Sequence, residues 1–398
     1  MKSLKTMRIV LATIIVGIGI ATSANAQFPT TAGNVGNFSG IIQGSTAGTD
    51  TQLNSAHATI TVTTAGVFSG KLNRSGVVTT VAGTFNPTTG VFSTAAPVSG
   101  AGEAFNLTYS SAGTPSITGT ITRYKAGAPV AVLNLSAIQT YSKVDLPPVG
   151  KTGIYNVALT APVAPPSLAV GEYPTGNSVG TFTVKGTDGT AKAVIRLADG
   201  TVATSATWLR KNSTVGIYAP FAARLGALVG NATVDTSALN TDVTGTGLRW
   251  FRAPNNSHYY QAGYEEGLTV DLTGAFQSTS TLGSMNFTAN SPNATLTVSS
   301  PLVAGSPVTK NMDVNGSGVG LTNPLTKDPK FTILPTTSTK SGQITGQYTD
   351  LSSGKHSIFG IVVAKGGVSN AYGFLLSPLP KNVDGTGKGG LVQIVALP

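Results

Sequence analysis

The sequence predicts an all-β protein with two or three antiparallel modules, each barrel-like or sandwich-like and containing a repeated three-strand meander. The first observation is alternation: residues 58–62 and 105–109 carry apolar side chains at every second position, which is the period of a half-buried strand. The second is the spacing of Gly, Asn, Pro and Ser turns, roughly every 8–12 residues, which is typical of sandwiches and up-and-down barrels. The third is that few stretches after the N-terminus show helical spacing of apolar residues.

A short pattern supports the repeated meander. Residues 66–72 and 342–348 both read as a Gly turn followed by a strand with alternate apolar residues. In each copy a Ser-Gly pair follows within a few residues, Ser75-Gly76 in the first and Ser353-Gly354 in the second, and another strand comes next. Residues 188–209 form a looser copy. Recurrence in the same order predicts that one supersecondary unit is built more than once.

A second pattern marks where modules begin. Residues 36–42 resemble residues 153–159, and the stiff pair Pro147-Pro148 lies between them, where it cannot continue a central strand. We therefore expect four segments along the chain. They are a signal peptide at 1–26, an N-terminal β module at 27–147, a central β module at 148–275, and a C-terminal β module at 276–398, which can also form one unit with the central module.

The N-terminal residues predict export. Lys2, Lys5 and Arg8 precede an apolar run at 9–20, and Ala24-Asn25-Ala26 has the small-x-small form of a cleavage site. The alternative is a membrane anchor, but crossing a bilayer takes about 20 apolar residues. We expect cleavage after Ala26, no transmembrane segment afterwards, and an extracellular or outer-surface location, with the periplasm as the alternative.

Composition narrows the classes of function. Charged residues make up 10% of the chain, against about 25% in an ordinary globular protein, so Thr, Ser, Asn and Gly must cover the surface. The formal charge is +10, but the Lys and Arg residues form no continuous run. A nucleic-acid binder would cluster its basic residues on one face. Cysteine is absent, which excludes disulfides and thiolate metal sites. We expect no nucleic-acid partner.

The residues needed for catalysis do not form a recognisable set. The chain has three histidines and no Gly-x-Ser-x-Gly elbow. Glu265 and Glu266 are adjacent, so on a strand they would point to opposite faces rather than flank one glycosidic bond. His-x-x-x-His is also absent. The sequence therefore predicts a protein that is not an enzyme, with no catalytic residues, no metal site and no cofactor.

One aromatic cluster has the composition of a ligand-binding surface. Sugars stack on exposed aromatic rings, while Arg can bond hydroxyls or carboxylates. The ordinary alternative is that these rings close a barrel mouth or pack two sheets together, because each large ring buries much area. The candidate residues are Arg249, Trp250, Arg252, His258, Tyr259, Tyr260 and Tyr264.

Several segments also resemble a known type of sequence. They include residues 197–201, 216–220, 248–252, 258–264 and 371–375. In this order they are similar to an uncharacterised Gly/Thr-rich β-module of secreted and cell-surface proteins, including autotransporter-like chains, of environmental Gram-negative bacteria. The likeness covers roughly residues 150–398, with a weaker echo at 33–145. It implies a location and a fold class, and no chemistry.

These observations predict a non-enzymatic secreted or cell-surface protein with a structural or adhesive role. Its expected partners are further copies of itself or a cell-envelope polysaccharide. The alternative is a polysaccharide-binding module that uses the aromatic and Arg cluster. An outer-membrane β-barrel is disfavoured, because aromatic residues are only 7% of the chain and form no paired girdles.

Overall fold

The computed structural model describes residues 34–45, 51–255, 259–277, 285, 291–300, 306–315, 318–321, 331–335, 341–350, 354–377 and 389–397. Strands dominate this part of the chain, and its helical elements are short 3-10 turns at Gln52–Asn54, Val149–Lys151 and Ala222–Arg224. The all-β prediction is therefore confirmed, including its barrel-like antiparallel modules. The predicted signal peptide lies outside the described residues.

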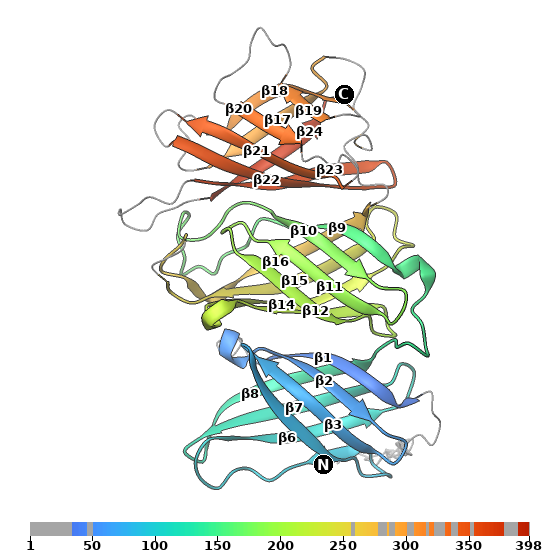
Figure 1. Cartoon of the computed structure of the whole chain (residues 1–398). Helices are drawn as coiled ribbons and strands as arrows, with labels where there is room; N and C mark the ends of the chain where they lie inside the picture. The colour runs from blue at the N-terminus through green and yellow to red at the C-terminus, as the bar shows by residue number, and fades with distance from the viewer. Residues whose placement is uncertain are drawn as a thin grey trace, which may run out of the picture.

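The strands form three eight-stranded sheets that follow one another along the chain and stack in a row (Figure 1). The N-terminal module contains β1 (Gly36–Gly44), β2 (Ala56–Val62), β3 (Val67–Arg74), β4 (Val77–Thr84), β5 (Val91–Ser93), β6 (Gly102–Ser110), β7 (Ser116–Lys125) and β8 (Ala128–Gln139). The central module contains β9 (Gly153–Leu159), β10 (Ser178–Val184), β11 (Thr190–Arg196), β12 (Val202–Trp208), β13 (Thr214–Pro220), β14 (Gly226–Val234), β15 (Val243–Arg252) and β16 (Tyr264–Phe276). The C-terminal module contains β17 (Ala294–Ser299), β18 (Val308–Asn315), β19 (Gly318–Leu321), β20 (Phe331–Pro335), β21 (Gln343–Asp350), β22 (Gly354–Lys365), β23 (Val368–Leu376) and β24 (Gly389–Ala396).

The N-terminal and central sheets share one strand order, and the C-terminal sheet has the same central pairing with its edges shifted by one strand. The first strand of each sheet pairs with the last in antiparallel fashion: β1 with β8, β9 with β16, and β17 with β24. The fourth and fifth strands are the edges of the first two sheets, whereas in the C-terminal sheet the edges are the third and fourth strands, β19 and β20. Each sheet therefore curls into a barrel-like wall with one seam, and in the central module an isolated bridge between Leu209 and Val215 crosses that seam.

The topology corrects one inference drawn from the sequence patterns. Residues 66–72 lie in β3, the third strand of its sheet, whereas residues 342–348 lie in β21, the fifth strand of its sheet. The best sequence match thus joins hairpins at different places, because a turn followed by alternation describes any pair of neighbouring strands. Residues 36–42 and 153–159, by contrast, both fall in the first strand of their sheets.

Alternation along each strand separates core from surface. In β8, Ala131, Leu133, Leu135 and Ala137 are buried, while the residues between them are exposed. Each module has its own apolar cluster. In the N-terminal module the cluster includes tilted and edge-on ring pairs, such as the tilted pair Phe68 and Phe85 with centroids 4.7 Å apart.

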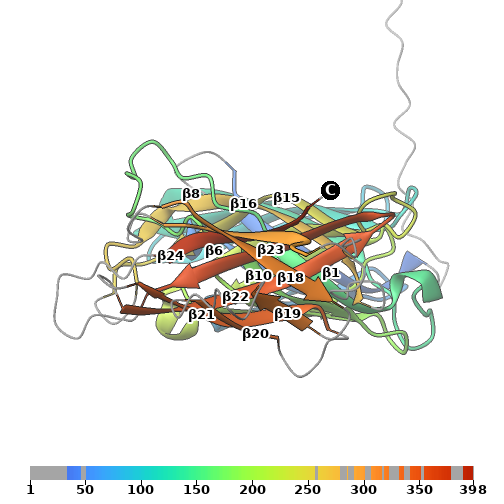
Figure 2. The same cartoon turned by 90° about the horizontal axis from the view of Figure 1, so that it is seen from above.

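The modules touch through the outer faces of their walls. Some strands are buried on both faces, which gives continuous runs of buried residues at 38–42 in β1, 155–159 in β9, 215–219 in β13 and 360–364 in β22. Seen along the row, the three modules overlie one another (Figure 2). We call the contact between the N-terminal and central modules the N-terminal joint, and that between the central and C-terminal modules the C-terminal joint.

The N-terminal joint combines a small apolar cluster with a polar chain. Ile41 of β1 packs with Tyr218, Ala227, Val229 and Phe251 of the central module. Beside it the Ser39 hydroxyl shares hydrogen bonds with His57 Nε2 at 2.9 Å and with Thr207 Oγ1 at 3.1 Å. Gly216 makes room for this arrangement, since a Cβ there would lie 2.5 Å from Arg210 Nη2 and 3.1 Å from Ile41 Cδ1.

The C-terminal joint extends the core of the central module. Ile361, Val363, Phe374 and Leu376 of the C-terminal module belong to the same buried cluster as the central barrel residues. The Asn156 side-chain amide donates to the carbonyl oxygens of Ser341 and Val362 at 2.7 and 3.0 Å. Lys365 also forms an ion pair with Asp242 at 2.5 Å.

Candidate functional site

The structure places the predicted aromatic and Arg cluster mostly inside the molecule. Trp250 is fully buried, and its ring meets that of Tyr264 edge-on with centroids 5.4 Å apart. Phe251, on the opposite face of β15, packs in the N-terminal joint. Trp250 and Tyr264 therefore present no open face to a sugar in this structure, and they occupy the core positions that were the alternative interpretation.

Arg252 lies at the end of β15 and is buried beside Asp199. Its guanidinium is buried, pairs with the Asp199 carboxylate, and donates from Nη1 to Thr201 Oγ1 at 2.7 Å. Tyr264 Oη donates to the same carboxylate at 3.1 Å, and burial together with Asp199 raises the pKa of Tyr264 well above its ordinary value. The Asp199 carboxylate therefore has its partners, Arg252 and Tyr264, within the protein.

The other candidate residues are divided between different surroundings. Tyr259 Oη donates to the Ser377 carbonyl at 2.6 Å, and the Gly389 amide donates to Tyr260 Oη at 2.7 Å, so both tyrosines hold the C-terminal module. Arg249 reaches Thr269 Oγ1 at 2.7 Å and lies over the Phe251 ring. His258 lies outside the described residues. The predicted set is therefore not one binding surface.

A cavity of about 400 Å³ lies beside the buried ion pair. Asp199, Thr201 and Arg252 contribute polar groups to its wall, and Phe221 and Tyr259 contribute rings. The carboxylate and the guanidinium already bond to each other. Asp199 and Thr201 flank Gly200 in the turn between β11 and β12.

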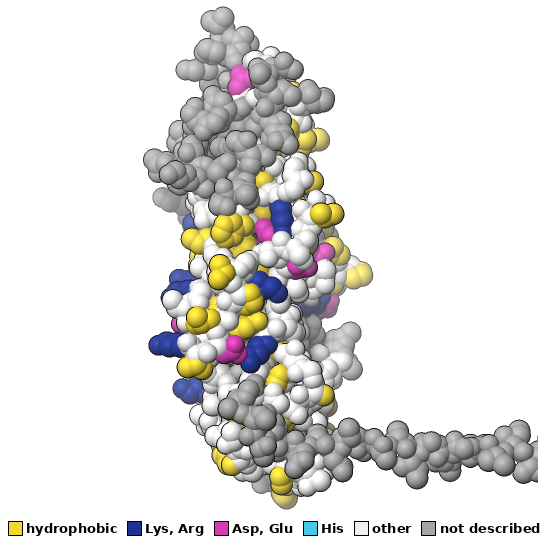
Figure 3. All heavy atoms as spheres, turned by 90° about the vertical axis from the view of Figure 1, so that its right-hand side faces the viewer, with side chains coloured by type: hydrophobic (Ala, Val, Ile, Leu, Met, Phe, Trp, Pro, Cys, Tyr) yellow, Lys and Arg dark blue, Asp and Glu magenta, His cyan; other side chains and the backbone are white. Residues whose placement is uncertain are grey.

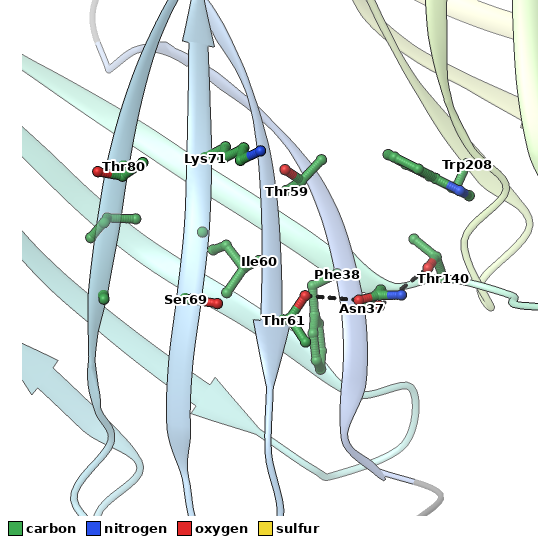
Figure 4. A pocket seen from close by; sticks show the side chains of 13 residues that line it. Asn37, Phe38, Thr59, Ile60, Thr61, Ser69, Lys71, Thr80, Thr140 and Trp208 are labelled. Atoms are coloured by element: carbon green, nitrogen blue, oxygen red, sulfur yellow. Dashed lines mark hydrogen bonds between the residues drawn. The ribbon is translucent and has the colours of Figure 1, made fainter.

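A second hollow, of about 410 Å³, lies at the N-terminal joint (Figure 4). Its floor is the outer face of β1 to β4, and its far wall is the indole of Trp208 from β12. We call it the Trp208 groove. It lies between modules, because its floor belongs to the N-terminal module and its aromatic wall to the central module.

The floor of the Trp208 groove is built from two cross-strand rows. Strand pairing aligns Asn37, Thr61, Ser69 and Ala82 in one row. The second row runs from the buried Ser39 through Thr59 and Lys71 to Thr80. Within the floor, Thr61 Oγ1 donates to Asn37 Oδ1 at 2.8 Å (Figure 4). Hydroxyl and amide groups thus repeat at the spacing of neighbouring strands, about 4.8 Å.

The neighbours of Trp208 fix its position against the N-terminal module. Thr207 bonds to Ser39 through its hydroxyl at 3.1 Å, and the Leu209 carbonyl accepts from the Tyr141 amide at 3.1 Å. Despite these attachments on both sides, the Trp208 side chain is 37% exposed. Alternation along β12 could have found it, since Ala203, Ser205 and Thr207 are buried and Trp208 falls on the other face.

Ser39 and His57 lie within hydrogen-bond distance of each other, and both are buried in the N-terminal joint. Burial and the nearby Arg210 guanidinium lower the pKa of His57 to about 4. A catalytic pair would instead place a carboxylate beside the histidine and leave the serine open to substrate. The pair forms a buried hydrogen bond within the N-terminal module, and Ser39 continues it to Thr207 of the central module.

Two further findings concern the described residues alone. In that part of the chain, no three or more His, Asp or Glu side chains come together in an arrangement that could hold a metal ion. Over the same residues, no helix has the length and apolar character needed to cross a membrane.

Comparison with known proteins adds little. No family model matches the sequence, and no curated protein matches it. Among solved structures, the chain is similar to a protein of unknown function from the DUF3598 family of Nostoc punctiforme, with a TM-score of 0.20 and 9% identity over 62% of this chain and 97% of that one. A similarity of this size supports no inference about function.

Proposed function

We propose that the protein is an exported, non-enzymatic component of the cell surface that acts as a structural or adhesive element. The observation that carries this proposal is the pair of joints. Buried polar and apolar contacts at both joints hold three barrels in one row. A row of fixed length can separate two surfaces or present its walls at a set distance from a cell.

The outer walls suit such a role. Their exposed strand positions include many Thr, Ser and Asn residues, which are hydrated without charge. On the face shown in Figure 3, Lys and Arg side chains gather around the middle of the row. The seam of each barrel leaves edge strands, and unpaired edges are available for association with another chain. Self-association is therefore part of the proposed role.

Location is the first test. An epitope inserted after Gly113, at an exposed turn where a side chain would meet open space, allows detection in fractionated native cells. We expect the protein, shortened by its first 26 residues, on the outer surface or in the medium, where added protease degrades it. Recovery of the full-length chain from the cytoplasm would overturn the proposal.

The role itself is tested with a deletion strain. Loss of the protein should reduce attachment of cells to a surface or to one another, and the wild-type chain should restore it. Ile41→Asp places a charge in the apolar cluster of the N-terminal joint and should disconnect the N-terminal module, which small-angle scattering would detect as a bent particle. If this disconnected chain restores attachment fully, a rigid row is not what the function requires.

A further inference from the structure

The Trp208 groove has features that a purely structural wall does not need. We infer that it binds a strand of acidic polysaccharide, with a sugar ring stacked on Trp208 and the strand lying across β1 to β4. This inference goes beyond the structural role, since a row of barrels would hold its shape without any ligand.

The first argument is the exposed ring. The 37% of Trp208 that stays exposed forgoes the free energy that burying it would supply. The two flanking residues, Thr207 and Leu209, contact the N-terminal module, so the backbone that carries the ring is held in place before any ligand arrives. A preorganised ring loses little conformational entropy on binding, and the hydrophobic face of a pyranose ring is a matching partner.

The second argument is the set of hydroxyl groups on the floor. Hydroxyl groups of Thr59, Thr61, Ser69 and Thr80 are both donors and acceptors, as are the hydroxyls of a sugar. Their spacing of about 4.8 Å from strand to strand provides a contact at each strand along an extended ligand. A hydrocarbon ligand would leave these groups without partners, at a cost in free energy for each.

The third argument is charge. Lys71, in the middle of the second row, is exposed and is the one charged side chain among the residues that line the groove. No carboxylate is among those lining residues to oppose it. Lys71 therefore favours a ligand that carries carboxylates at intervals, which distinguishes an acidic polysaccharide from a neutral one.

The test uses the mature full-length chain and oligogalacturonate as the acidic probe, with a neutral gluco-oligosaccharide of the same length for comparison. Isothermal titration calorimetry should show the acidic probe binding at least about tenfold more tightly than the neutral one. Trp208→Ala should weaken binding by about tenfold or more, whereas Trp208→Phe should retain most of the affinity.

Lysine variants measure the contribution of the Lys71 charge to binding. Lys71→Gln should weaken binding several-fold and reduce its dependence on salt, and the exposed Lys125, which lies outside the groove, provides the matched control Lys125→Gln with no change. Fluorescence adds a second signal. In Trp208→Phe the remaining Trp250 is buried, so the emission change on binding should vanish even though binding persists.

Three results would overturn the inference. They are no binding of oligogalacturonate, equal affinity for the neutral oligosaccharide, and wild-type affinity in a folded Trp208→Ala protein. If Trp208→Ala fails to fold, the exposed Lys71→Gln variant decides in its place. A protein found on the cell surface as a rigid row that binds no acidic glycan would contradict this inference while leaving the structural role intact.

Discussion

The two joints hold neighbouring modules together through different kinds of contact. At the C-terminal joint, apolar residues of β22 and β23 join the core cluster of the central barrel. At the N-terminal joint, a separate cluster of five residues lies beside a buried polar chain through Ser39, His57 and Thr207. The first joint resembles a continued core, whereas the second depends on hydrogen bonds and on a neutral histidine.

The two joints also share one feature, a buried polar side chain in the first strand of a module. Ser39 and Asn156 occupy the same place in their modules, each three residues after the glycine that begins the first strand. Both are fully buried, and both bond to the next module along the chain. A buried polar group must be satisfied, so each of these side chains specifies how its neighbour sits. Apolar contacts alone would allow one module to slide against the next.

The largest expected effect comes from breaking the apolar joint. Phe374 is fully buried and stacks on Phe359 with centroids 5.2 Å apart. Phe374→Ala should lower the free energy of unfolding by about 3–5 kcal/mol, because it removes contacts and leaves a cavity. Denaturant unfolding measures the loss. Val395→Ala, at a side chain that is 56% exposed, is the control and should change stability by less than about 0.5 kcal/mol.

Acid should destabilise mainly the N-terminal joint. Because the folded state holds the pKa of His57 at about 4, below its ordinary value of 6.5, the unfolded chain binds a proton first as the pH falls. Stability from this site is complete above pH 6.5, declines from there to about pH 4, and amounts to about 3 kcal/mol. Melting curves between pH 7 and 4 measure the decline.

His57→Gln provides the control for the acid experiment. Glutamine keeps a donor and an acceptor near Ser39 but does not titrate in this range. The variant should therefore flatten the pH dependence between pH 6.5 and 4, at some cost in stability at neutral pH. An unchanged pH dependence in this variant would assign the acid sensitivity to other groups.

Substituting the two buried polar side chains should cause intermediate and unequal losses of stability. Asn156→Ala leaves two carbonyl groups without their donor and should cost about 1–3 kcal/mol, while Ser39→Ala removes one hydroxyl and should cost about 1 kcal/mol. Limited proteolysis of the linkers, together with denaturant unfolding, reports both values. A larger loss in Ser39→Ala than in Asn156→Ala would mean that the polar chain, rather than the amide, dominates module docking.

The smallest effect belongs to a surface ion pair. Lys211 and Asp145 lie 2.6 Å apart across the N-terminal joint, and the Asp145 side chain is 50% exposed. Exposed pairs contribute about 0–1 kcal/mol, so Asp145→Asn should shift the melting temperature little. A loss as large as that of Ser39→Ala would contradict the view that buried contacts hold this joint.

The amino-acid sequence was sufficient for the fold class and for the start of two modules. Strict alternation in segments such as 58–62 requires one buried and one wet face, and that requirement is local. The match between residues 36–42 and 153–159 does identify two equivalent first strands. It also contains Ser39 and Asn156, whose role in docking no local pattern could reveal.

Only the tertiary structure decided the sites. In the sequence Trp250 and Trp208 look equally able to contact a ligand. In the structure Trp250 lies in a barrel core and Trp208 lies at the edge of a joint. The floor of the Trp208 groove and its wall are separated by more than a hundred residues. Exposure and proximity depend on how barrels stack, and stacking is set by side chains that meet across modules. Periodicity within one strand carries no information about such distant contacts.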